Sequence, residues 1–294
     1  MSLRVTQRSL TSTTTANLQQ NLTKMQRIQE QLSSGRQLNR PSDSPTGTVS
    51  ALRLRSDLRR SEQLARNAND GLGWLAQADT SLTQTLDATA RVRELALQGR
   101  NDSMSDTDRQ ALAAEVDTLK EHLFGIANTS YLGRPLFGGT SSAAQAYDTT
   151  TGAYQGDAGV VSRTVLDGVT LPVNVTGPQA FGTPGADLFT TLDQIATDLR
   201  ANPAGLDADV AALDTHTVKI KTTLAAVGAR YNQVEGMQSR LESSRLDAQN
   251  ALSEVESVDL PATITELNLQ QVAYQAALAA TSKVIQPSLV DFLR

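Results

Sequence analysis

The two histidines are the first residues to test for chemistry, because imidazole serves both as a general base and as a metal ligand. His122 lies between Glu121 and Leu123, and His216 has no second histidine or carboxylate at ligand spacing. Zinc sites and histidine-centred triads normally draw on more such residues than this chain provides. We therefore expect no catalytic residue and no metal site.

Other catalytic patterns are also missing from the sequence. The chain contains no cysteine, which excludes disulfides, thiolate ligands and a cysteine nucleophile. The glycines of LGRPLFGGT, residues 132–140, neither follow a strand nor open a helix, so they fit neither a dinucleotide-binding turn nor a P-loop. No serine stands in a G-x-S-x-G setting. The protein is therefore predicted not to be an enzyme and to bind no cofactor.

Charge and hydropathy narrow the classes of partner. The 294 residues carry 26 Lys and Arg against 31 Asp and Glu, a formal net charge of −5, which argues against nucleic acid as a partner. No stretch approaches the roughly 18 apolar residues of a membrane helix. The first thirty residues contain no apolar signal segment. We expect no membrane insertion and no cleaved signal peptide.

Apolar residues at alternating steps of three and four dominate the elements that remain. Between residues 210 and 255 this spacing continues for more than six heptads, and 11 of the 14 seam positions are apolar. Such a pattern predicts a left-handed coiled coil. Similar patterns predict one long helix from Thr46 to about Gly99 and a shorter one that opens at Ser105 or Asp106. Helices of roughly 50 residues would each run about 75–80 Å, which indicates an elongated rod.

The middle of the chain changes character. Residues 137–185 contain few charged residues and a larger share of Gly, Thr and Val. In TVLDGVTLPVNV, apolar and polar residues alternate on both sides of Asp167-Gly168, which is typical of a hairpin with a two-residue turn. The segment AYDTTTGAYQG, residues 146–156, suggests a second hairpin. The predicted fold is therefore mainly α, with long antiparallel coiled-coil helices formed by both chain ends and a small β-rich insert.

Both ends of the chain carry apolar stripes that a rod has little core to bury, so we expect them to form an assembly interface. Pro41 and Pro45 interrupt the helix after the first stripe and are predicted to act as a hinge. Three domains follow: residues 1–45 with 256–294 as assembly region, 46–136 with 186–255 as rod, and 137–185 as insert. The predicted interface residues are Leu10, Leu18, Leu22, Met25, Leu32, Tyr274, Leu278, Ile285, Leu289, Phe292 and Leu293.

Five segments, in consistent order, resemble the hook-associated protein 3 family, the flagellin-like proteins of the bacterial hook-filament junction. The resemblance covers most of the chain and departs at Ser44, where the family often has an acidic residue, and at Leu132, where Asn is common. The segments are LRVTQR, QEQLSSGRQLNRPSDSPTG, ALRLRSDLRRSEQLARNANDGLGWL, IANTSYLGRPLFGGT and QQVAYQAALAATSKVIQPSLVDFL.

The resemblance implies a non-enzymatic structural protein of the extracellular flagellum. It also implies export through the flagellar type III apparatus with a chaperone, and assembly of copies into a layer between the first hook-associated protein and flagellin. In that layer the terminal helices would line the tubular core, with the middle segment facing outward.

Two alternatives to a junction protein remain. Flagellin, the filament subunit, has the same arrangement of helical chain ends. The segments SSGRQLNRPSDSPTG and LFGGT, the latter at the border of the insert, favour a junction protein. A cytosolic coiled-coil scaffold would accommodate the heptads, but neither the β insert nor the apolar C-terminal tip.

Overall fold

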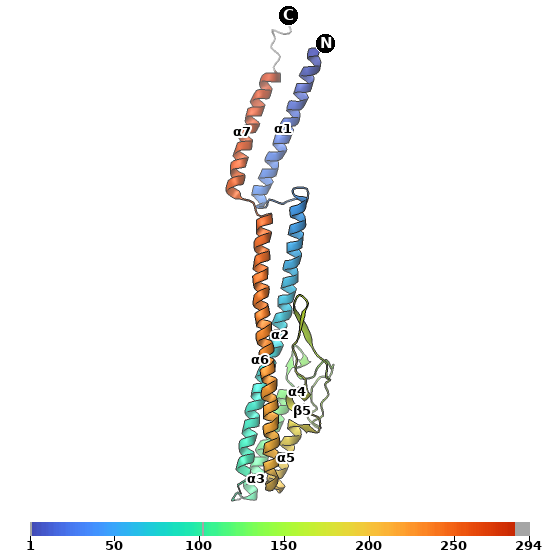
Figure 1. The fold of residues 1–294 in the computed structure, drawn as a ribbon, viewed down its shortest axis with the longest axis vertical. Coiled ribbons are helices and arrows are strands. Elements are labelled where there is room, and N and C mark those ends of the chain that lie inside the picture. The colour runs from blue at the N-terminus through green and yellow to red at the C-terminus, as the bar shows by residue number, and fades with distance from the viewer. Residues whose placement is uncertain (1, 102, 286–294) are drawn as a thin grey trace. The chain divides into compact units, whose positions relative to one another are not determined.

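The computed structural model describes the backbone of residues 2–101 and 103–285, and the side chains of residues 12–101 and 103–282. The chain divides into two compact units, residues 1–59 with 245–294 and residues 60–244. Long helices build most of both units, which confirms the mainly α fold predicted from the sequence (Figure 1). The division into three domains and the rod shape stay predictions. The first unit extends past the boundaries expected at residues 45 and 256.

Two short connectors separate the helices of the first unit. Gly35 ends the first helix with φ of +67°, a conformation that glycine adopts without steric cost. Ser44 Oγ accepts a hydrogen bond from the Gly47 N–H (3.1 Å) at the start of the second helix, whose first residue is Pro45. The unit contains α1 (Ser2–Ser34), the start of α2 (Pro45–Gly99), the end of α6 (Leu206–Glu256) and α7 (Leu260–Ile285).

The second unit combines the rest of α2 and α6 with shorter elements. Its helices are α3 (Asp106–Ala127), α4 (Gly177–Phe181), α5 (Leu188–Ala201) and a 3₁₀ turn, η1 (Pro203–Gly205). Its strands form three antiparallel pairs: β1 (Ser130–Tyr131) with β2 (Arg134–Pro135), β3 (Ser162–Leu166) with β4 (Val169–Pro172), and β5 (Gly182–Thr183) with β6 (Ala186–Asp187). Among the described residues, no helix is both long and apolar enough to cross a membrane.

In the second unit α2 and α6 run antiparallel in a fixed register. Arg93 Nε donates to Asp214 Oδ1 (2.7 Å), and Gln238 Nε2 donates to Asn69 Oδ1 (2.9 Å). The two contacts lie 24 residues apart on both helices, so the register is constant along this length. The predicted seam of α6 is confirmed, because all 14 positions from Val210 to Val255 are buried or half-buried.

The insert shares one hydrophobic core with the helices of the second unit. Trp74 of α2 is fully buried and meets Tyr131 of β1 edge to face, with ring centroids 5.5 Å apart. Tyr147 from the insert packs against Phe181 of α4 (5.8 Å) and Phe189 of α5 (5.0 Å). Aromatic pairs of this kind add to the stabilisation from burial. The side chains of the insert therefore contribute to the main core.

The hairpin predicted at Asp167-Gly168 is confirmed, with Gly168 at φ of +73° between β3 and β4. The second predicted hairpin is reduced to one isolated antiparallel bridge between Tyr147 and Tyr154. A further hairpin joins β1 to β2 through Leu132 and Gly133, and both residues have positive φ, 50° and 76°. This is the turn geometry that favours Asn-Gly over Leu-Gly.

We predict that Leu132→Asn stabilises the protein by about 1 kcal/mol, because Asn tolerates the left-handed conformation that strains Leu. Leu132 is 77% exposed, so its replacement removes little buried surface. Denaturant unfolding followed by the fluorescence of Trp74, the single tryptophan, measures the change. Leu132→Ala is the matched control, since Ala keeps the strained conformation. Equal stabilisation by both variants would show that backbone strain is not the cause.

Candidate functional site

The two terminal helices, α1 and α7, lie side by side in the first unit and run antiparallel (Figure 1). Their facing positions follow the same steps of three and four that mark the seam of α6, as expected for two helices that supercoil. All of these positions are buried or half-buried. They are Thr14, Leu18, Asn21, Met25, Ile28 and Leu32 on α1, and Thr263, Leu267, Gln270, Tyr274, Ala277 and Thr281 on α7.

The seam between α1 and α7 is only partly apolar. Gln270 Nε2 donates to Asn21 Oδ1 (3.2 Å) and to the Asn21 carbonyl oxygen (3.4 Å). Thr263 and Thr281 fill two of the most buried positions on α7. A polar pair inside a coiled-coil seam fixes the register at a cost in stability. The pairing of the two helices is therefore specific, and polar side chains occupy part of its seam.

The predicted interface residues fall into three groups. Leu18, Met25, Leu32 and Tyr274 lie on the seam. Leu22 and Leu278 lie beside it, with 38% and 44% of their surface exposed. The side chains of Leu10 and Ile285, and the residues Leu289, Phe292 and Leu293, lie outside what the structure describes. Their assignment to an assembly surface stays a prediction.

Helix α7 also carries apolar residues that face away from α1. Ile264, Leu269 and Val272 are 49%, 71% and 64% exposed. Only two of the 26 residues of α7 are charged, Glu266 and Lys283. Helix α7 therefore has uncharged, partly apolar surface beyond the stripe that meets α1. Sequence reasoning placed Ile264 in the C-terminal apolar stripe but missed Leu269 and Val272, because it searched for one stripe, whereas the signal was the scarcity of charge around the whole helix.

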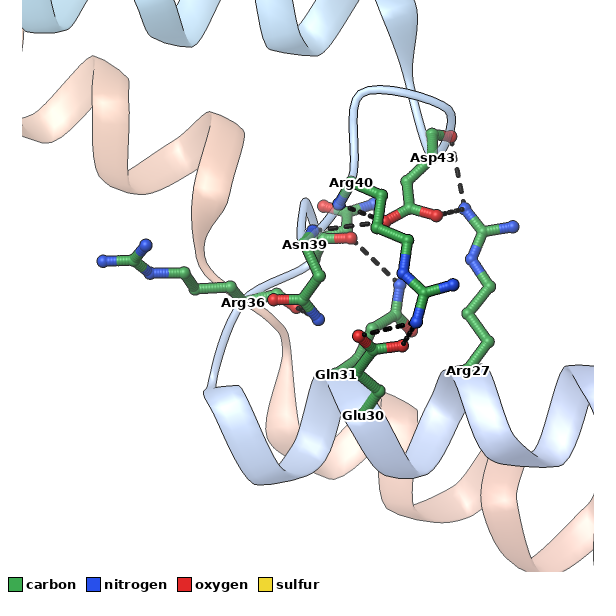
Figure 2. Close-up of polar contacts among 8 residues, drawn as sticks. Arg27, Glu30, Gln31, Arg36, Asn39, Arg40 and Asp43 are labelled. Atoms are coloured by element: carbon green, nitrogen blue, oxygen red, sulfur yellow. Dashed lines mark hydrogen bonds and ion pairs between the residues drawn. The ribbon is translucent and has the colours of Figure 1, made fainter.

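The connector between α1 and α2 is organised by Asp43 (Figure 2). Asp43 Oδ2 accepts hydrogen bonds from the backbone N–H groups of Arg40 (2.8 Å) and Asn39 (3.2 Å). Its Oδ1 pairs with Arg27 of α1 at 3.2 Å. The Arg40 N–H, helped by that of Asn39 and by the Arg27 charge, lowers the pKa of Asp43 from its usual value. One half-buried carboxylate therefore ties α1 to the turn before α2.

Further contacts hold the same joint. Arg40 reaches back to Glu30 of α1, with Nη2 3.1 and 3.2 Å from the two carboxylate oxygens (Figure 2). The Gln37 N–H donates to the carbonyl of Glu256 (2.8 Å), and the Val258 N–H donates to that of Gly35 (3.2 Å). The connector from α1 and the connector into α7 thus pair through their backbones. One hydrogen-bonded joint therefore connects α1 to the start of α2 and the end of α6 to α7.

The hinge predicted at Pro41 and Pro45 coincides with this joint. Pro45 occupies the first position of α2, and Pro41 is exposed in the turn. Their use as a hinge stays a prediction. Sequence reasoning identified the prolines but missed Asp43, because part of what makes it important is its pair with Arg27, 16 residues earlier in the chain.

The comparisons with known proteins point to one family. Residues 5–142 and 210–293 match the models of the bacterial flagellin N-terminal and C-terminal helical regions. The chain is 28% identical over 283 residues to a flagellin of Bacillus subtilis, with 92% of each protein covered. It is 26% identical over 276 residues to flagellar hook-associated protein 3 of Escherichia coli, covering 85% of this chain and 87% of that protein.

The fold is also similar to a crystal structure of flagellar hook associated protein-3 from Legionella pneumophila. That likeness has a TM-score of 0.62 at 16% identity and covers 69% of this chain and 98% of the other. The two family models lie at opposite ends of the chain and together match most of its length. The chain therefore belongs to the bacterial flagellin family.

Proposed function

We propose that the protein is a structural component of the bacterial flagellum, in the junction layer that joins hook to filament. The uncovered apolar surface of α7 carries this proposal, because a terminal helix of this kind needs neighbouring subunits to cover it. The match to hook-associated protein 3 of Escherichia coli covers 87% of that protein, which supports a place for this chain in the junction. The family is structural, which supports a role without catalysis.

Flagellin is the second candidate, because the Bacillus subtilis flagellin matches the chain over a similar length. The two roles differ in how far the assembly grows. A filament subunit extends from a seed without limit, whereas a junction protein stops after a short layer. The connector and the border of the insert, SSGRQLNRPSDSPTG and LFGGT, favour the junction role.

The energetics of the ends support folding that is coupled to assembly. Ordering one residue costs roughly 1–2 kcal/mol of backbone entropy, while full burial of a Leu returns about 1.5–3 kcal/mol. Only some of the residues on α1 and α7 are apolar, and Leu269 and Val272 remain exposed. A pair of such helices does not offset its ordering cost in water. We infer that neighbouring subunits supply the missing burial.

A junction role also determines the protein's partners and its location. Copies of the chain form the layer, with the first hook-associated protein on one side and flagellin on the other. Export without a cleaved signal, escorted by a chaperone, would deliver the chain to the extracellular flagellum. Terminal helices that fold only on assembly would keep the exported chain thin and prevent premature polymerisation.

The experiment that tests the proposal locates the protein in purified flagella. We predict a single labelled band between hook and filament when the chain complements a strain that lacks it. Leu269→Asn combined with Val272→Asn should reduce incorporation at least roughly tenfold, because these side chains lose their burial against neighbours. The unfolding midpoint of the second unit, reported by Trp74, should not change.

Val218→Asn is the matched control, since Val218 is 63% exposed on α6 in the second unit. It should be incorporated normally. Label along the whole filament would identify a flagellin instead. Normal incorporation of the double variant would show that this face of α7 takes no part in assembly.

The Asp43 joint sets the direction in which α1 leaves α2, so we predict that it matters for assembly more than for the stability of the second unit. Asp43→Ala removes the acceptor of two backbone N–H groups, each bond worth about 1–3 kcal/mol, and the partner of the half-exposed Arg27, a pair worth less than about 1 kcal/mol. Incorporation into flagella should fall at least tenfold. Asp57→Ala, at an exposed Asp near the start of α2, should leave incorporation unchanged. Equal loss with both variants would refute a specific role for the joint.

A further inference from the structure

Two carboxyl groups meet in the interior of the second unit, at the corner where α5 is followed by η1 and α6. Asp198 is 6% exposed on α5, and Asp209 is 7% exposed on α6. Their side chains interact directly. Two ionised carboxylates in one buried place repel each other, and each loses its hydration. Ionisation of both carboxyl groups would therefore destabilise this corner unless neighbouring groups compensate for the charge.

One neutral side-chain donor compensates for part of this charge. Gln194 Nε2 donates to Asp198 Oδ1 at 3.2 Å. Asp209 Oδ2 is fully buried and has no hydrogen-bond partner among the described residues. An ionised oxygen in that position would be costly, whereas a protonated carboxyl could donate to its neighbour.

The nearby charges are engaged elsewhere. Arg100, at the end of α2, pairs with Asp207 (2.6 Å), and Arg200 of α5 pairs with Asp117 of α3. Lys120 of α3 pairs with Asp193 on the outer side of α5. Each of these cations is paired with a partly exposed carboxylate.

The corner also leaves little space for another ligand. A side chain on Gly205 of η1 would collide with Asp198 Oδ2 and with the side-chain amide of Asn202. The Asn202 N–H donates to the carbonyl of Asp198 (3.0 Å) and closes the end of α5. A proton, which needs no added volume, fits this place better than a cation with its ligands.

We propose that Asp198 and Asp209 hold one proton between them in the folded protein and that this proton makes the α5–α6 corner more stable as the solution becomes mildly acidic. Burial, together with the negative charge of Asp198, raises the pKa of Asp209 to about 6 from 3.8. The folded state therefore binds the proton more tightly than the unfolded state. Stability from this group is fully present below pH 3.8 and is lost as the pH rises through about 6.

His216 contributes to the pH dependence with the opposite sign. His216 of α6 lies beside Thr191, with Nε2 3.1 Å from Oγ1, and its pKa is lowered by burial, with Lys219 adding to the effect. Protonation of His216 in the unfolded chain therefore weakens the fold as the pH falls. A comparison of variants at each pH cancels this contribution, because His216 is present in all of them.

The test is denaturant unfolding of the full chain at pH 5 and pH 8, followed by Trp74 fluorescence. When the pH is raised from 5 to 8, the unfolding equilibrium constant of the wild type should increase about tenfold more than that of Asp209→Asn, because an asparagine at that position cannot ionise. Asp198→Asn should reduce the pH dependence less than Asp209→Asn does, because it removes the like charge but leaves the burial of Asp209. Asp87→Asn, an exposed Asp on α2, should keep the wild-type pH dependence.

The outcomes separate cleanly. A smaller rise in both buried variants, with the control unchanged, supports the shared proton. If wild type and Asp209→Asn differ by the same factor at pH 5 and pH 8, the proposal is wrong. The readout concerns the second unit alone, so either result leaves the flagellar role to be tested on its own.

Discussion

Helix α7 exposes apolar surface that the described residues of its chain do not cover, and assembly of this protein depends on that imbalance. Its partner α1 covers one side through a seam that contains Asn21, Gln270 and two buried threonines. The opposite side exposes Leu269 and Val272. In water such a helix gains too little from one neighbour to offset the entropy of ordering. Association with further copies is the simplest source of the missing burial.

The second unit shows the contrasting case of a core that closes on itself. The seam of α6 is covered throughout, and the aromatic side chains of the insert complete the same core. Nothing in this core needs a neighbour. Within the first unit, hydrogen bonds of the two connectors at the Asp43 joint fix how the terminal helices continue from the adjoining ends of α2 and α6. A self-sufficient unit, a defined joint and an incomplete pair of ends together fit a subunit that adds to a growing structure.

Sequence reasoning predicted the elements with strong periodicity and missed those that depend on three-dimensional context. The heptads of α6 and the Asp167-Gly168 turn were predictable because spacing and turn chemistry are local signals. The departure from the family pattern at Leu132 marked the residue that the fold strains, with φ of +50°. Asp43 and the pair of Asp198 with Asp209 were not predictable. Their environments arise from residues that are distant in sequence or from burial that no pattern encodes.

The central claim is that the two ends become ordered only through assembly, and amide hydrogen exchange on the purified monomer tests it most directly. The account predicts fast exchange over roughly residues 1–40 and 260–294, beside strong protection in 46–130 and 206–255. In isolated flagella the terminal amides should become protected as well. Slow exchange at both termini in a chain verified to be monomeric would contradict the account, because the pair of end helices would then be stable without neighbours.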